Sequence, residues 1–141
     1  MSDGKPILLS GAGIASLLFA QSLKQSGIPF MIFERDASFV FRAQGYRLRL
    51  SNEDLDAIES VLDGPMWEKF WEKCSKTGGA GFTALDAVAG EKQTYHVVPE
   101  DLESRDDKIV GISRGDMRKF FATGCEDHIE WAKQVTVYEL S

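Results

Sequence analysis

Two glycines and one acidic residue near the start of the chain have the types and spacing of a nucleotide site. Gly11 permits a tight turn, and Gly13 lets a pyrophosphate approach the backbone because no Cβ stands in the way. The N–H groups of Ile14 and Ala15 would face an anion if a helix begins there. Glu34 lies 23 positions after Gly11, where a carboxylate can accept both hydroxyl hydrogens of an adenosine ribose. The pattern predicts the adenosine and pyrophosphate end of a dinucleotide site.

One residue departs from the usual glycine pattern. Ser16 stands where a third glycine usually lets the helix pack closely on the strand. That position does not contact phosphate, so the added Cβ and hydroxyl affect packing rather than binding. Glycine spacing alone is weak evidence, and the alternative is an inherited scaffold whose glycines serve only the turn.

The elements that must position these residues form a βαβ unit. Residues 7–9 are a short apolar run, as expected for a strand buried on both faces. Residues 14–25 have helical character, and Gly27 follows at a position that commonly ends helices. Residues 30–33 supply the second strand, so Glu34 comes at its carboxyl end. The crossover between the strands should be right-handed.

The rest of the chain predicts further short elements around this unit. Ser51 and Ser113 are each followed three residues later by aspartate, which resembles a capping box at the start of a helix. A Gly64-Pro65 pair should break the chain between two helices. In chain order we expect strand 46–50, helix 51–62, helix 66–74, a loop over 75–81, paired strands 82–86 and 94–98, strand 109–112, helix 113–123, and one or two strands within 129–140.

The charge balance excludes some classes of partner. The formal net charge is −6, whereas nucleic acids and anionic membranes are bound by basic surfaces. No apolar run approaches the roughly 20 residues that span a bilayer, and the N-terminus lacks a signal-peptide layout, so a cytoplasmic protein is expected. Cys74 and Cys125 lie far apart and the two histidines complete no zinc pattern, so no metal is expected.

A stripe of aromatic residues is a second candidate for ligand binding. Trp67, Phe70 and Trp71 fall on one face of the predicted helix 66–74 and could line a pocket for an apolar substrate. The same spacing is typical of a helix that packs on a core. In a shortened protein, the stripe could instead be an exposed patch that favours a dimer or a partner chain.

Several segments resemble one enzyme family. GAGIASLLFAQSLKQSGIPFMIFERD resembles the opening of the FAD-dependent aromatic-hydroxylase-type (para-hydroxybenzoate hydroxylase-like) monooxygenases. FRAQGYRLRLSNEDLDAI and VGISRGDMRKFF are similar to later segments of that family, in variants common in secondary metabolism. The resemblance covers essentially the whole chain. It implies one domain over residues 1–141, an α/β, Rossmann-like βαβ FAD-binding half-fold with additional short antiparallel strands.

The resemblance also implies cofactor and substrate contacts. Together with the helix N–H groups, the implied FAD-binding residues are Gly11, Gly13, Ile14, Ala15, Glu34, Arg35 and Arg114. Arg42 and Gln44 match a loop near the flavin, and Trp67 and Trp71 are candidates for contact with the flavin or the substrate. NAD(P)H would be the co-substrate of a monooxygenase.

Family members are much longer, and the segments that hold the flavin ring in the family have no counterpart here. Three functions therefore remain open. The first is an FAD-dependent monooxygenase acting on a small aromatic, polyketide-like or terpenoid-like substrate, as a dimer or with a partner chain that covers the shortened face. The second is a cofactor-free cyclase or isomerase that holds an apolar intermediate in a reactive shape. The third is a non-catalytic fragment or partner subunit.

Overall fold

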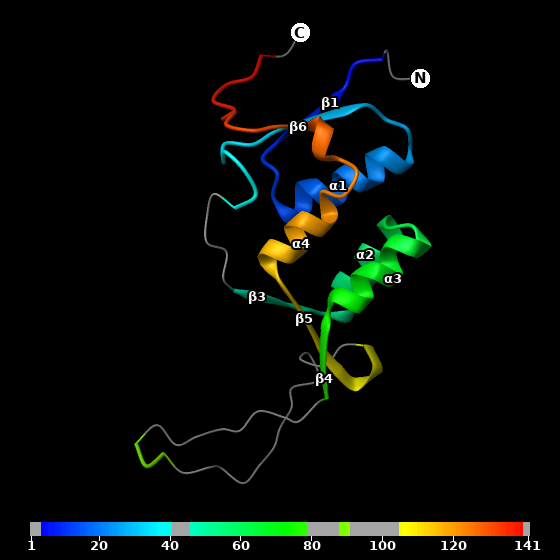
Figure 1. The fold of residues 1–141 in the computed structure, drawn as a ribbon, viewed down its shortest axis with the longest axis vertical. Coiled ribbons are helices and arrows are strands. Elements are labelled where there is room, and N and C mark those ends of the chain that lie inside the picture. Colours follow the sequence, from blue (N-terminus) through cyan, green and yellow to red (C-terminus); the bar gives the residue numbers. More distant parts are fainter. Residues whose placement is uncertain (1–3, 41–45, 79–87, 91–104, 140–141) are drawn as a thin grey trace.

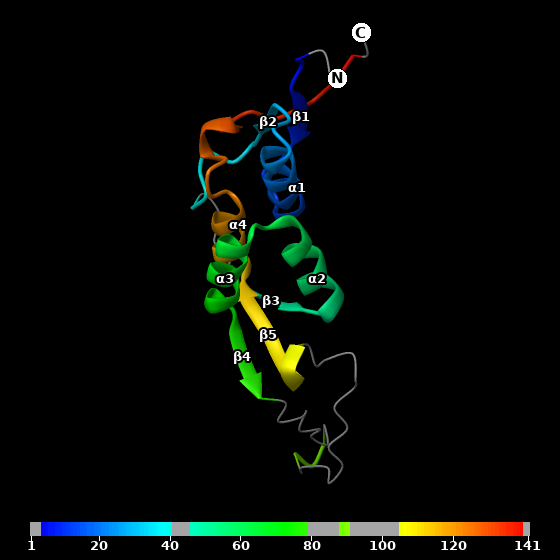
Figure 2. The same ribbon diagram turned by 90° about the vertical axis from the view of Figure 1, so that its right-hand side faces the viewer.

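A computed structural model describes residues 4–40, 46–78, 88–90 and 105–139. In this part of the chain, two three-stranded sheets lie on either side of the helices (Figure 1 and Figure 2). One sheet is parallel and the other is antiparallel. The predicted α/β class with additional antiparallel strands is therefore confirmed.

The parallel sheet contains the predicted βαβ unit. Its strands are β1 (Ile7–Ser10), β2 (Phe30–Phe33) and β6 (Ile129–Glu130), in the order β1-β2-β6. Helix α1 (Ile14–Gln25) makes the crossover between β1 and β2, which pair along their full length. Gly27 follows the helix with a φ of +65°, which is the conformation predicted for a residue that ends a helix.

Strand β1 is more exposed than its apolar sequence predicts. Ile7 is 38% exposed and Leu8 is 64% exposed, whereas Phe30 and Ile32 of β2 are buried. Leu8 pairs with Met31, so it lies on the face of the sheet opposite to Phe30 and Ile32. The expectation of a strand buried on both faces is therefore wrong for β1. An apolar run shows what a strand can bury, but not whether a neighbour covers it.

Two substitutions should show this difference in burial. Ile32→Ala should lower the free energy of unfolding by about 2–4 kcal/mol, because it empties a fully buried site. Leu8→Thr places a β-branched residue, a type that is common in strands, at an exposed position and should change that free energy by no more than about 0.5 kcal/mol. Urea denaturation followed by circular dichroism measures both values. Equal losses would show that Leu8 is buried in solution.

The antiparallel sheet lies beyond the helices. Its strands are β3 (Arg47–Leu50), β5 (Lys108–Ser113) and β4 (Ser75–Gly78), in the order β3-β5-β4. Strands β3 and β5 agree with the predicted strands to within a residue at each end. Their pairing brings Arg47 opposite Ser113 and so sets where the following helix begins.

Strand β4 corrects the prediction of a loop over 75–81. Residues 75–78 are mostly polar and show no alternation, but their backbone pairs with β5. The strand is therefore imposed by the hydrogen-bonding groups of a neighbour that is distant in sequence, which local patterns do not record. The strands expected over 82–86 and 94–98 lie outside the described residues.

Side-chain caps begin the helices of this region as predicted. At the start of α2 (Asn52–Val61), the Ser51 hydroxyl accepts from the Asp54 N–H at 3.2 Å, and the Asp54 carboxylate accepts from the Ser51 N–H at 2.9 Å. At the start of α4 (Arg114–Phe121), the Ser113 hydroxyl accepts from the Asp116 N–H at 3.0 Å. Each contact satisfies backbone donors that the helix cannot pair internally.

Helix α3 (Gly64–Lys73) begins two residues before its predicted start. Asp63 caps it by accepting from the Met66 N–H at 2.8 Å, and Gly64 and Pro65 form its first turn. Proline is tolerated there because its missing N–H would have no partner within the helix. The Gly64-Pro65 pair thus marks the boundary between α2 and α3, but it belongs to the second helix.

The remaining elements are short. Two 3₁₀ turns, η2 and η3, cover Arg105–Asp107 and Glu126–His128. Of the closing strands predicted within 129–140, the described part, 129–139, contains the two paired residues of β6, and residues 131–139 follow without regular structure. Backbone contacts hold the start of this segment beside the residues that follow β2, since the Lys133 N–H donates to the Glu34 carbonyl at 2.8 Å.

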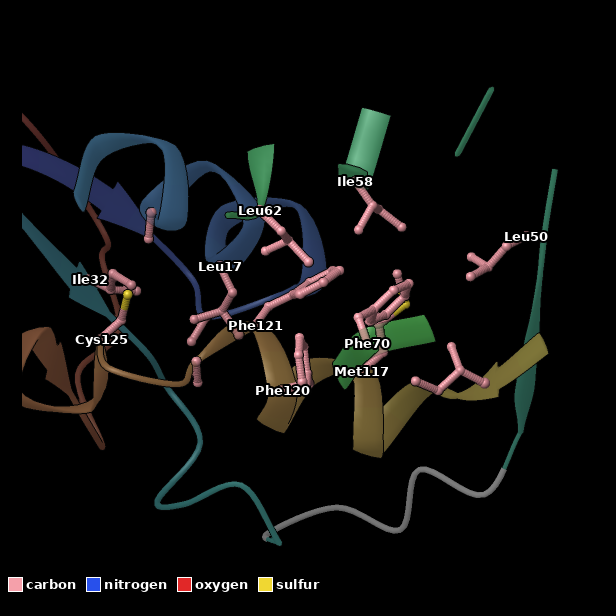
Figure 3. Packing of buried hydrophobic residues seen from close by; sticks show 14 of the residues in the cluster. Leu17, Ile32, Leu50, Ile58, Leu62, Phe70, Met117, Phe120, Phe121 and Cys125 are labelled. Atoms are coloured by element: carbon pink, nitrogen blue, oxygen red, sulfur yellow. The ribbon is translucent and has the colours of Figure 1, made fainter. Parts of the chain in front are cut away.

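An aromatic core joins α3 to α4 (Figure 3). Phe70 of α3 is fully buried, and its ring centroid lies 5.5 Å from those of both Phe120 and Phe121. Trp67 and Trp71 are half-buried and pack against this core. The aromatic stripe of α3 therefore serves mainly as a core contact, with part of the two indoles left at the surface.

Candidate nucleotide-binding site

A cleft of about 410 Å³ lies where β1 and β2 end and α1 begins. Parallel α/β sheets bind ligands at the carboxyl ends of their strands, and small-molecule sites measure about 300–1,000 Å³. The cleft brings together most of the residues predicted to bind a cofactor. Its lining residues are Ser10, Gly11, Gly13, Phe33, Glu34, Arg35, Asp36, Arg114, Arg118, Lys133, Gln134 and Val135.

Gly11 and Gly13 differ in whether the backbone requires glycine at their positions. Gly11 has a φ of +91°, which L side chains rarely adopt, and its N–H donates to the Phe33 carbonyl at 2.7 Å. Gly13 has a φ of −76° and a ψ of 171°, an extended conformation open to any residue. A Cβ built on Gly13 would meet no atom within 4 Å. Neither backbone conformation nor packing within the described chain therefore requires glycine at position 13.

The first turn of α1 adds backbone donors beside the cleft. The Leu17 N–H donates to the Gly13 carbonyl at 3.0 Å as the helix begins, so the N–H groups of Ile14, Ala15 and Ser16 precede the intrahelical ladder. Ser16 is half-buried within this turn, and the helix forms with serine in place of the usual third glycine. These donors and the helix dipole favour a negatively charged group in the cleft.

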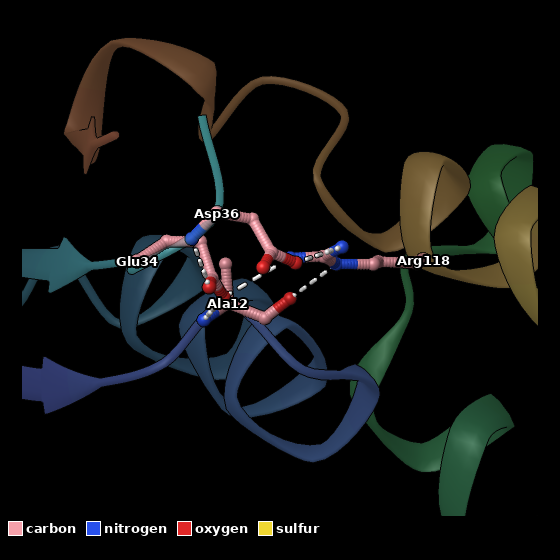
Figure 4. A network of polar contacts seen from close by, with 4 residues as sticks. All are labelled: Ala12, Glu34, Asp36 and Arg118. Atoms are coloured by element: carbon pink, nitrogen blue, oxygen red, sulfur yellow. Dashed lines mark hydrogen bonds and ion pairs between the residues drawn. The ribbon is translucent and has the colours of Figure 1, made fainter. Parts of the chain in front are cut away.

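Glu34 directly follows β2, and its side chain is almost buried and bonded through both oxygens (Figure 4). Oε2 accepts the Ala12 N–H at 2.7 Å and Nη2 of Arg118 at 3.0 Å, and Oε1 accepts the Asp36 N–H at 2.9 Å. A carboxylate offers about four acceptor sites, so these contacts leave about one. Glu34 can therefore take one ribose hydroxyl as it stands. To accept both ribose hydroxyls, as the sequence predicts, the carboxylate would have to lose one of its three present donors.

The surroundings of Glu34 favour its ionised form. Burial raises the pKa of this carboxyl, but the N–H groups of Asp36 and Ala12 and the charges of Arg118 and Arg35 lower it. The net result is a pKa below the ordinary value of 4.5. Glu34 is therefore an anionic hydrogen-bond acceptor at neutral pH.

Arg118 is one of the cleft residues that sequence reasoning missed. It is 4% exposed, and its Nε donates to the Ala12 carbonyl at 2.7 Å while Nη1 lies 3.5 Å from Oδ2 of Asp36. The sequence carried a signal, because Arg114 and Arg118 are four positions apart and must share one side of a helix. Only Arg114 was predicted to reach the cofactor, and the structure brings both arginines to the cleft.

The cleft is cationic although the chain as a whole is acidic. Its charged lining residues give a formal charge of +2, against −6 for the whole chain. Such a local excess attracts anionic ligands. The charged lining residues are the cations Arg35, Arg114, Arg118 and Lys133 and the acids Glu34 and Asp36.

No protein-family model matches the chain, but known proteins do. It is 30% identical over 151 aligned residues to the dual O-methyltransferase/FAD-dependent monooxygenase CTB3 of Cercospora beticola, covering 98% of this chain and 16% of that protein. It is 29% identical over 135 residues to the FAD-dependent monooxygenase nscC of Neosartorya fischeri, covering 92% of this chain and 32% of that protein. The chain is related to the FAD-dependent monooxygenases. It spans only about a sixth to a third of the length of these relatives.

Solved structures show the same fold. A protein of Photorhabdus luminescens described as an FAD-containing monooxygenase superposes with a TM-score of 0.70 at 22% identity, over 94% of this chain and 32% of that one. The tetrameric form of 2-methyl-3-hydroxypyridine-5-carboxylic acid oxygenase gives a TM-score of 0.65 at 17% identity, over 94% and 33%. At these identities the likeness establishes the fold alone.

The remaining candidates from the sequence lie elsewhere. Trp67 and Trp71 line a separate cleft of about 500 Å³, together with Asn52, Arg105 and Asp106. The structure thus does not bring the indoles into the cleft that contains the glycine turn. Arg42 and Gln44 lie outside the described residues, and their predicted place near the flavin stays a prediction.

Two further features concern the described residues alone. Within them, no helix is long and apolar enough to cross a membrane. No group of three or more histidine, cysteine, aspartate or glutamate side chains there could hold a metal ion.

Burial raises the pKa of the Cys74 thiol to about 11, although the charge of Lys76 lowers it, so this thiol is protonated at neutral pH.

Proposed function

We propose that this chain binds the adenosine and pyrophosphate end of FAD as part of a monooxygenase of a natural-product pathway. The observation that carries the proposal is Gly13. The residues that the structure describes give no reason for glycine there, whereas a phosphate group that approaches the backbone does. The relationship to FAD-dependent monooxygenases identifies the cofactor class. The comparisons name monooxygenases, and they lend no support to a cyclase or a non-catalytic subunit.

Residues in and beside the cleft have separate roles in this proposal. The N–H groups of Ile14 and Ala15 receive the pyrophosphate, and Glu34 accepts a ribose hydroxyl. Arg35, which is exposed at the rim, lies beside the adenine, and Arg114 contacts the cofactor from the start of α4. The cationic lining of the cleft compensates the two phosphate charges. When bound, FAD would supply the oxygen-activating chemistry, which these side chains do not have.

The finer features of the whole enzyme follow as part of the same proposal. NAD(P)H is the co-substrate, and the substrate is a small aromatic, polyketide-like or terpenoid-like molecule. The location is cytoplasmic. A second copy or a partner chain covers the exposed face of β1, where Leu8 is 64% exposed.

The first test is the visible spectrum of the purified protein, followed by titration with FAD. Gly13→Ala should weaken FAD binding at least tenfold, about 1.4 kcal/mol, because the new methyl occupies the space left for a phosphate. The thermal midpoint should change little, since the methyl meets no protein atom. Both quantities are measured on the same preparation, by flavin fluorescence and by calorimetry.

Gly64→Ala is the matched control. Gly64 also lies at the start of a helix with nothing within 4 Å of a built Cβ, but it is not in the cleft. This variant should bind FAD like the wild type. Binding by Gly13→Ala at wild-type strength, or no binding of FAD by the wild type, would contradict the proposal.

A further inference from the structure

Arg118 joins three segments of the chain that meet at the cleft. Its guanidinium contacts the carbonyl of Ala12 in the glycine turn, the carboxylate of Glu34 at the end of β2, and the carboxylate of Asp36 beyond it. Arg118 comes from α4, 106 positions after Ala12 and 84 after Glu34. One side chain thus connects the parallel sheet, the glycine turn and the helix layer (Figure 4).

The contacts around Ala12 form a closed ring. The Ala12 N–H donates to Oε2 of Glu34, the same oxygen accepts from Nη2 of Arg118, and Nε of Arg118 donates to the Ala12 carbonyl. Ala12 stands between Gly11 and Gly13, so the most flexible point of the turn is fixed at both its N–H and its carbonyl. This ring determines which way the following N–H groups face.

The guanidinium is itself held in place. Its central carbon lies 5.6 Å from the ring centroid of Phe39 and 5.9 Å from that of Trp131, and these two rings pack edge to face at 4.6 Å. Arginine can form several bonds from one rigid plane, which lysine cannot. The arrangement is therefore specific to arginine.

We propose that Arg118 is a positioning residue for the nucleotide: it acts through Glu34 and the Ala12 carbonyl to fix the carboxylate that receives the ribose. It fills one acceptor site of Oε2 and directs the remaining acceptor capacity of the carboxylate to the ligand. The inference rests on the proposed nucleotide site. It adds that ribose recognition depends on a side chain of α4 that need not touch the ligand.

The test measures the affinity of AMP, and of 2′,3′-dideoxy-AMP as a probe without ribose hydroxyls, by calorimetry. Arg118→Lys should weaken AMP about tenfold, about 1.4 kcal/mol, and should change the affinity for the dideoxy probe much less. In a Glu34→Gln background, the same exchange should have little further effect on AMP, because residues that act through one another are not additive.

Lys133→Gln is the matched control for loss of a cation. Lys133 lines the same cleft but is exposed, so its effect should be alike for both probes and additive with Glu34→Gln. If Arg118→Lys does not fold, Trp131→Leu tests the same link, because it removes one ring beside the guanidinium and keeps the charge. It should weaken AMP and leave the dideoxy probe unchanged.

The outcomes separate this inference from the proposed function. If the wild type binds neither AMP nor FAD, both fail. If it binds AMP but the effects of Arg118→Lys and Glu34→Gln add, or the two probes weaken equally, only the role of Arg118 is wrong.

Discussion

Phe70→Ala should lower the free energy of unfolding by about 3–5 kcal/mol. Phe70 is fully buried, and its ring lies 5.5 Å from those of Phe120 and Phe121 and 5.9 Å from that of Trp67. Its removal leaves a cavity between α3 and α4 that these large rings cannot fill without shifting. Since native domains are stable by only about 5–15 kcal/mol, such a loss would bring the protein close to unfolding.

Phe19→Ala is the matched control, because Phe19 is 48% exposed on α1 and the exchange is chemically identical. It should cost about 1 kcal/mol or less. Urea denaturation followed by circular dichroism gives both values. Similar losses for the two variants would mean that α3 does not pack on α4 in solution as it does here.

The part of the fold that local chemistry determines was predictable. The βαβ unit follows from an apolar run, a glycine turn and a helical segment that all lie within residues 7–33. Ser51 and Ser113 identify helix starts because a cap and its partner are three residues apart. In each case the interacting groups are neighbours in sequence, so a pattern can record them.

The predictions that were wrong concern features that depend on residues distant in sequence. Nothing within residues 75–78 indicates a strand, because the partner that imposes one is β5, thirty or more positions away. The exposure of Leu8 depends on what covers one face of the sheet, which the sequence of β1 does not contain. Local patterns report what a segment can do, and tertiary contacts decide what it does.

The candidate site also has features that the sequence predicts and features that depend on distant residues. Gly11, Gly13 and Glu34 were predictable because their spacing within one βαβ unit has a physical reason. That Glu34 already holds three donors was not, since one of them comes from Arg118, 84 positions later. The sequence therefore predicts the ligand class and the acceptor, but not how many ribose hydroxyls the acceptor can take.

Arg118→Met should destabilise the protein by about 3–5 kcal/mol at neutral pH. The carboxylates of Glu34 and Asp36 are buried, and methionine would leave them without the cation that lies 3.0 Å and 3.5 Å away. It would also remove the donor to the Ala12 carbonyl. The loss follows from the charge left behind, not from side-chain volume, because methionine fills similar space.

The pH dependence distinguishes this cause from a packing defect. In the wild type the pKa of Glu34 is lowered, so its stabilising contribution is present above about 4.5 and is lost as the pH falls through the folded-state value. Without Arg118, one of the charges that lower the pKa of Glu34 is gone, so this pKa is higher in the variant than in the wild type. The gap in the free energy of unfolding between the wild type and the variant therefore widens as the pH increases through mild acid, and it is smallest at low pH.

Urea denaturation at several pH values from mild acid to neutral measures this gap. Arg118→Lys, which keeps the charge but not the planar fork, should show a smaller loss and a weaker pH dependence. A gap that stays constant with pH would mean that Arg118 stabilises the fold through packing on Phe39 and Trp131. A gap that widens toward neutral pH would show that the ionised carboxylates need Arg118, so that the acceptor for the nucleotide is maintained by a helix far from it in sequence.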